Sequence, residues 1–226
     1  MPGLGSINTK KHSYKLVRSN RKTLSIEVNI NAQLIVRSPK KLSLDDIEKY
    51  INDKYDWIQS KVRLAQLNIP HKHNYVINEK FLYLGNLYPL TTSKQKQNLT
   101  FDGHSFRNSE AGKSDFLKWY KKEFTNIAVP RLYYYAETYQ LEFNQVRVKA
   151  QKTLWGSCSS KNNINLNYLL MMAPMSVIDY VIVHELSHTV HKNHSLKFWN
   201  LVSYIFPDYK ASIYWLKENG YKLHRL

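Results

Sequence analysis

The chain has 226 residues, which is enough for one large domain or two small ones. Hydrophobic residues make up 43% and charged residues 22%, so the composition is that of a globular protein with a packed core and excludes disordered and fibrous proteins. The single cysteine, Cys158, excludes an internal disulfide, and we expect a reducing, cytoplasmic location. The sequence begins without an apolar signal segment and has no run long enough to span a bilayer, so we expect no membrane partner.

The chain is strongly basic, with 33 Lys and Arg residues against 17 Asp and Glu residues and a net charge of +16. Such a charge attracts anionic partners, and nucleic acid is therefore a candidate partner. The lysines are spread along the chain in short runs, without the block of five or six that marks a basic tail. A solvated basic surface is the simpler interpretation.

The first part of the chain is predicted to be rich in strands. Alternating or apolar runs predict strands at Ser13–Val17, Leu24–Ile30 and Leu34–Arg37, which form a hairpin or a small meander. Ser43, with Asp46 three residues later, resembles a capping box. It predicts one helix from there to about Leu67, with an apolar stripe on one face.

A second hairpin is predicted at Phe81–Leu90, with Gly85-Asn86 as its turn. The polar segment Ser93–Gly112 is predicted to hold loop and strand fragments. We therefore place a boundary there, between a strand-rich region with one long helix at 1–112 and a catalytic region at 113–226.

The second region begins with a long helical pattern from Ser114. Pro130 lies inside this pattern and is predicted to kink or split the helix, because proline removes a donor and clashes with the preceding turn. Strands are predicted at Val146–Val148 and Ile164–Leu169.

The window from Val181 to His194 carries the chemistry. It contains four of the nine histidines and the pattern H-E-x-x-H at residues 184–188. On a helix, His184 and His188 lie one turn apart on the same face, so both imidazoles can reach one zinc ion, and Glu185 beside them can hold a water. Ser176, with Asp179 as in a capping box, and the apolar residues that follow predict a buried helix here.

A catalytic zinc usually takes three protein ligands, so a third is needed. His191 lies about 10.5 Å along the helix from His184 and fits poorly on a straight helix. His194 is the better candidate if the helix ends near His191 and Asn193 makes a left-handed turn. Asp208 or Glu218 is the acidic alternative. His191 is then a residue that orients a ligand, faces the substrate or is exposed.

Several segments together resemble the YgjP-like metallopeptidase family and, more distantly, the SprT-like zinc proteases. They are Thr153–Ser159, Ile164–Asn167, Pro174, Asp179–Val181, His184–His188, Asn193-His194 and Phe198-Trp199. The close resemblance covers Val146 to Gly220. It implies an α+β, zincin-like metallopeptidase fold, with a strand-rich N-terminal part and a helical C-terminal catalytic part.

The resemblance also implies a site: His184, His188 and His194 as metal ligands and Glu185 as the catalytic base. Leu154 departs from the family, where an arginine usually precedes the tryptophan, so no role is carried over for that basic group. Trp155 and Asn167 are interpreted as structural braces, and Cys158 as a small buried strand residue.

The sequence therefore predicts a zinc-dependent metallopeptidase that cleaves a peptide or protein substrate, with Zn²⁺ as cofactor and Glu185 as general base. His191, Tyr204 and Tyr209 are candidates for stabilising the oxyanion. One alternative is a basic nucleic-acid-associated protein with a structural or vestigial zinc site. Others are a protease that acts on DNA-bound proteins and a hydrolase of non-peptide amides.

Overall fold

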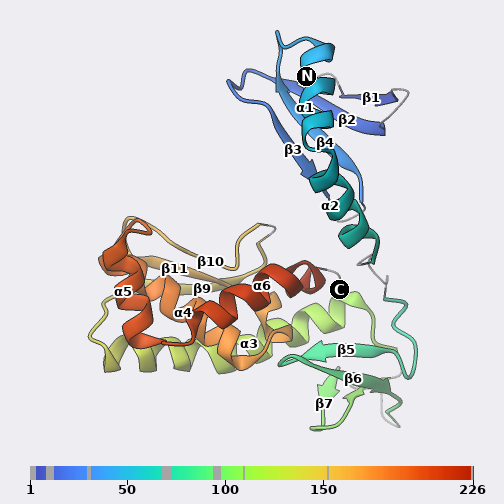
Figure 1. Cartoon of the computed structure of the whole chain (residues 1–226). Coiled ribbons are helices and arrows are strands. Elements are labelled where there is room, and N and C mark those ends of the chain that lie inside the picture. Colours follow the sequence, from blue (N-terminus) through green and yellow to red (C-terminus); the bar gives the residue numbers. More distant parts are fainter. Residues whose placement is uncertain are drawn as a thin grey trace. The chain divides into compact units, whose positions relative to one another are not determined.

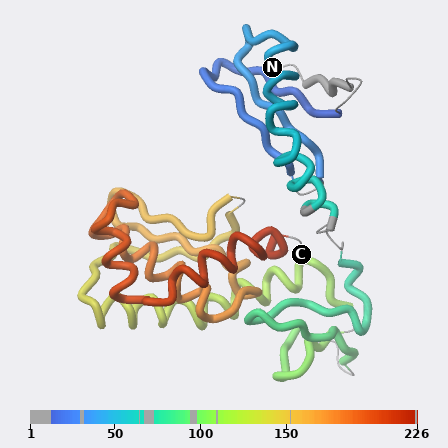
Figure 2. Tube along the Cα trace, viewed as in Figure 1, coloured from blue at the N-terminus to red at the C-terminus, as the bar shows by residue number. Residues whose placement is uncertain are grey.

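The computed structural model divides the chain into two compact units, Met1–His71 and Lys72–Leu226 (Figure 1). The residues that it describes are 4–8, 13–29, 32–67, 73–93, 98–108, 110–151, 153–224 and 226 (Figure 2). No helix among these residues is both long enough and apolar enough to cross a membrane.

The first unit is a four-stranded sheet with two helices. Its strands are β1 (Leu4–Asn8), β2 (Ser13–Ser19), β3 (Ser25–Val28) and β4 (Leu34–Pro39), in the order β1-β2-β4-β3. β3 and β4 form the predicted hairpin, but β2 pairs in parallel with β4, so the alternative of a simple meander is wrong. Ile30, at the end of one predicted strand, lies outside the described residues. Alternate residues of β2 and β4 point into the core because successive strand residues face opposite sides.

The predicted long helix is two helices, α1 (Leu44–Asp53) and α2 (Tyr55–Leu67). The hydroxyl of Ser43 accepts the N–H of Asp46 at 3.1 Å, which confirms the predicted start of α1. At the break, the N–H of Lys54 donates to the carbonyl of Ile51, three residues back. A bond that spans three residues instead of four ends the regular hydrogen-bond pattern of α1.

The second unit begins with a small sheet of four strands in the order β5-β6-β8-β7. They are β5 (Lys80–Tyr83), β6 (Asn86–Thr91), β7 (Thr100–Phe101) and β8 (Phe106–Arg107). The predicted hairpin is confirmed, but its turn is Leu84-Gly85, with φ of 48° and 83°, one residue earlier than predicted. Both central residues of this turn are left-handed, as the tightest hairpin turns require.

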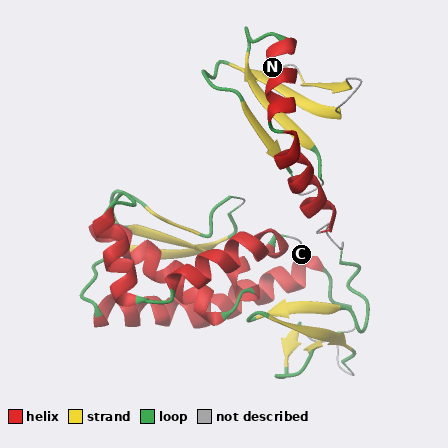
Figure 3. Ribbon diagram, viewed as in Figure 1, coloured by secondary structure: helices red, strands yellow, loops and turns green. Residues whose placement is uncertain are grey.

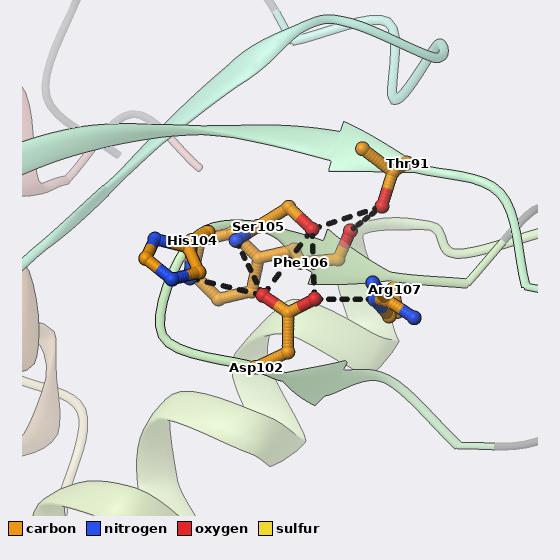
Figure 4. A network of polar contacts seen from close by, with 6 residues as sticks. All are labelled: Thr91, Asp102, His104, Ser105, Phe106 and Arg107. Carbon is orange, nitrogen blue, oxygen red and sulfur yellow. Dashed lines mark hydrogen bonds and ion pairs between the residues drawn. The ribbon is translucent and has the colours of Figure 1, made fainter.

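A polar network closes the β7–β8 turn (Figure 4). One carboxylate oxygen of Asp102 accepts the backbone N–H groups of His104 and Ser105 at 2.9 and 2.8 Å, and the other pairs with Arg107. The bonds from these backbone groups and from Arg107 lower the pKa of Asp102 to about 2. The hydroxyl of Thr91 donates to the carbonyl of Phe106 and so ties β6 to the turn.

Helix α3 (Lys113–Thr138) runs through Pro130 without the predicted split. Its buried residues recur every four residues on both sides of the proline, so packing along its whole length favours a continuous helix. The small sheet packs on the start of this helix, where the rings of Phe81 and Phe116 stack at 3.9 Å. Residues 73–111 therefore belong to the second compact unit, and the units divide at residues 71–72 and not near residue 112.

The rest of the second unit consists of helices and a three-stranded sheet, drawn in red and yellow in Figure 3. Its strands are β9 (Gln145–Lys149), β10 (Gly156–Cys158) and β11 (Asn163–Asn167), in the order β10-β11-β9. Its other elements are the 3₁₀ helix η1 (Tyr168–Met172), α4 (Met175–Val190), α5 (Leu196–Ile205) and α6 (Tyr209–Leu223). Helix α4 contacts α3, α5, α6 and the sheet, and ten of its sixteen residues are buried. The architecture is mixed α+β.

The turn at Leu84-Gly85 connects the small sheet to the segment before α4. The backbone N–H groups of Leu84 and Gly85 donate to the carbonyls of Met171 and Met172 at 2.9 and 3.1 Å. A Cβ atom on Gly85 would lie 2.8 Å from Cγ of Pro174, where α4 begins. This turn therefore needs glycine both for its φ and for its close approach to proline.

We predict that Gly85→Ala destabilises the protein more than Gly103→Ala. Both glycines have left-handed φ angles, +83° and +92°, but a Cβ at Gly103 meets nothing within 4 Å. The shared strain costs about 1–2 kcal/mol, and the contact with Pro174 adds about 1–3 kcal/mol by overpacking. Urea unfolding of both variants measures the difference, and equal losses of stability would contradict the assigned contact.

Candidate metal centre

The candidate site lies at the C-terminal end of α4. His184 and His188 are half-buried on this helix, while the residues around them are mostly buried. Residues four apart lie on the same face of a helix, so both imidazoles point to the same side. The sequence prediction of a buried helix that carries this pair is confirmed.

The helix ends where the sequence predicted, but by a different turn. The N–H of His191 makes the last helical bond, to the carbonyl of Ser187 at 2.9 Å, and His191 itself is extended, with φ −119° and ψ 104°. Asn193 is not among the described residues with positive φ, so the predicted left-handed turn there is wrong. The chain instead leaves the helix through the extended His191 and reverses at a bend formed by Lys192 and Asn193.

This reversal brings His194 to the helical pair. Its Nε2 atom lies 3.1 Å from Nε2 of His184 and 3.2 Å from Nε2 of His188. One ligand atom from each of the three histidines lies within 4.8 Å of the others, and no other such group occurs among the described residues. Tetrahedral zinc, with Zn–N distances of about 2.0–2.1 Å, needs nitrogens about 3.3 Å apart. The spacing and the three imidazole donors therefore fit Zn²⁺.

Two hydrogen bonds orient the helical imidazoles. Nδ1 of His188 lies 2.9 Å from the carbonyl oxygen of His191, and Nδ1 of His184 lies 3.3 Å from the hydroxyl of Tyr180. A bond at Nδ1 fixes the ring and leaves Nε2 directed at the shared point. Burial, followed by the neighbouring His188 and His194, lowers the pKa of His184 to about 3. The ring is therefore neutral, as a metal ligand must be.

Glu185 directly follows His184 on α4 and is only 5% exposed. Burial raises the pKa of its carboxyl group to about 8. A bound cation would stabilise the carboxylate and shift this pKa downward. A carboxyl group tuned towards neutral pH in this position can act as a general base.

The other candidate residues lie away from the histidine cluster. The side chain of His191 is outside it, and this residue contributes its backbone carbonyl. Asp208 and Glu218 are exposed and also outside it. Tyr204 is 74% exposed, whereas the ring of Tyr209 stacks on Trp199 at 5.4 Å. His191, Asp208 and Glu218 therefore do not join the cluster as a fourth ligand.

The predicted braces make the expected kind of contact. The side-chain amide of Asn167 donates to the carbonyls of Gln151 and Leu154 at 2.9 and 3.0 Å. Trp155 stacks on His224 with ring centroids 4.7 Å apart. Cys158 lies half-buried in β10, and burial raises the pKa of its thiol, which does not favour a nucleophile.

No pattern in the sequence predicts the ion pair that anchors α4. The predicted capping box is wrong, because α4 begins after Pro174 and the carboxylate of Asp179 is buried inside the helix. That carboxylate receives two bonds from the guanidinium of Arg131 on α3, at 2.5 and 2.6 Å. The partners are 48 residues apart, so no local pattern connects them.

One family model matches most of the chain. The model of the YgjP-like family, metallopeptidase domain, matches residues 22–219. The chain belongs to the YgjP-like metallopeptidase family. The match spans the sheet-forming strands after β2, the small sheet and all of the helices that surround the histidine cluster. The resemblance predicted from the sequence is thus confirmed, and with it a metal-dependent peptidase domain.

Among solved structures, this YgjP-like chain is similar to the metallopeptidase zymogen of Pyrococcus abyssi abylysin. The identity is 22%, the match covers 38% of this chain and 88% of that chain, and the TM-score is 0.35. No curated protein matches the sequence.

Proposed function

We propose that this YgjP-like protein is a zinc-dependent metallopeptidase with a zincin-like catalytic unit. The observation that supports it best is the cluster of His184, His188 and His194 beside the buried Glu185. Three protein ligands leave a fourth position of zinc for water or substrate, whereas structural zinc sites are closed, usually with cysteines. The arrangement therefore favours catalysis over a structural or vestigial zinc site.

Zn²⁺ on the three histidines would supply Lewis acidity, which lowers the pKa of water and polarises a carbonyl group. Glu185 then accepts the proton of the attacking water and later donates it to the leaving amine. The hydroxyl of Tyr180 and the carbonyl of His191 keep the two helical imidazoles in place during these transfers.

The open edge of β10 supports a peptide as substrate. Among the described strands, β10 lies at the edge of its sheet. The N–H of Asn167 bonds to the carbonyl of Trp155, and the N–H of Ser159 bonds to the carbonyl of Asn163. By the alternation of antiparallel pairs, the backbone groups of Gly156 and Cys158 then point away from β11. An extended peptide can pair with these groups next to Glu185.

This edge favours peptide bonds over non-peptide amides, because it recognises a main chain. Charge is the argument for a nucleic-acid partner or for a protease that acts on DNA-bound proteins, so both stay predictions of the sequence. The single free thiol of Cys158 fits a reducing compartment, for which we propose the cytoplasm.

We predict that His194→Ala loses zinc and that His191→Ala keeps it. The first change removes one of three nitrogen ligands, whereas the second leaves the backbone carbonyl that orients His188. Elemental analysis of protein purified without a metal-affinity tag should find about one zinc per chain in the wild type and in His191→Ala. Equal zinc in the two variants would contradict the ligand set.

We predict that Glu185→Gln abolishes peptide hydrolysis without loss of zinc. The amide is nearly isosteric but cannot accept the proton of water, so cleavage should fall about 10²–10⁴-fold. The assay uses a library of fluorescence-quenched peptides, with zinc measured on the same samples. Unchanged cleavage at normal zinc content would show that Glu185 is not the base.

A further inference from the structure

The side chain of Glu185 lies directly against the backbone of Gly156. A Cβ atom built on Gly156 would lie 2.6 Å from both Cγ and Oε1 of Glu185 and 2.8 Å from its Cδ. Real Cβ contacts are essentially never shorter than 3.0 Å. Gly156 is in an ordinary strand and is not among the glycines with positive φ, so the backbone conformation does not require glycine here. Glycine is required at this position because a larger residue would occupy the space that the Glu185 carboxylate fills.

Neither α4, which carries Glu185, nor β10, which carries Gly156, can move apart to relieve this contact. Glu185 is on a helix that is packed against three other helices and the sheet, and its Cγ, near the helix backbone, is among the atoms in conflict. On the other side, β10 is held in register with β11, with Gly156 opposite Leu166. The contact is therefore between two well-packed elements, and close-packed interiors adjust little to an added methyl group.

The residue before Gly156 is fixed from two directions. The carbonyl of Trp155 accepts the N–H of Asn167 at 2.9 Å, and Asn167 is fully buried. The indole ring stacks on His224, and a Cβ on Gly220 would lie 3.1 Å from it. Helix α6 thus supports the indole from the side, and β11 supports the backbone.

We propose that Gly156 is a positioning residue for Glu185. The backbone of β10 at Gly156 confines the carboxylate to one conformation. Trp155 and Asn167 hold this part of the backbone in place. The catalytic consequence rests on the proposed function, but the contact itself does not.

A double-mutant cycle on melting temperature tests the contact without any assay of activity. The four proteins are the wild type, Gly156→Ala, Glu185→Ala and the double variant. In the wild-type background, Gly156→Ala should lower the melting temperature by about 3–10 °C, as expected for overpacking in a protein of this size. In the Glu185→Ala background, which lacks the atoms in conflict, the same change should lower it by less than about 2 °C.

Gly220→Ala is the matched control, because its new Cβ meets Trp155 and not Glu185. Its effect on melting temperature should be the same with and without the Glu185 side chain. If Gly156→Ala alone does not fold but the double variant does, the proposal is supported. Equal shifts for Gly156→Ala in both backgrounds would overturn it.

The kinetic constants of Gly156→Ala distinguish a positioning role from a general loss of folded protein. At zinc content equal to that of the wild type, Gly156→Ala should lower kcat at least about 100-fold and change KM by less than about threefold, because a displaced base affects proton transfer and not binding. Unchanged kcat would overturn the positioning role. If the wild type cleaves no peptide, the proposed function fails, while the melting-temperature cycle still decides the contact.

Discussion

Ten of the sixteen residues of α4 are buried, and they include every residue from Val177 to Ser187 except His184. The geometry of the site depends on this constraint. A helix enclosed on all sides cannot rotate about its axis without exposing apolar side chains to water. His184, Glu185 and His188 therefore keep fixed directions, although each of them is polar. After the helix, the chain passes through the extended His191 and bends at Lys192 and Asn193, and His194 then completes the cluster.

The same helix is held at its other end by polar contacts. The guanidinium of Arg131 binds the buried carboxylate of Asp179, and the hydroxyl of Ser212 on α6 donates to the carbonyl of Ser176. A buried carboxylate without its partner would be strongly destabilising, so this ion pair fixes the position of α4 along α3. The first turns of the helix thus carry the anchoring contacts, while its last turns carry the chemistry.

The sequence predicted those parts of the site that have a local signature. The helical spacing of His184 and His188 and the short reach to His194 depend only on neighbouring residues. The contacts of Glu185 with Gly156 and of Asp179 with Arg131 join distant segments, and no periodicity relates them. The same limit explains one error in the fold. The continuous helix through Pro130 is favoured by packing on other elements, which a local pattern does not contain.

The central claim is that three histidines form an open zinc site beside Glu185. A crystal structure of zinc-loaded protein, with anomalous scattering measured on both sides of the zinc absorption edge, tests it most directly. The account predicts one zinc peak about 2.0–2.1 Å from Nε2 of each of the three histidines, with no fourth protein ligand. A fourth protein ligand that closes the site, or no zinc at this cluster, would contradict it.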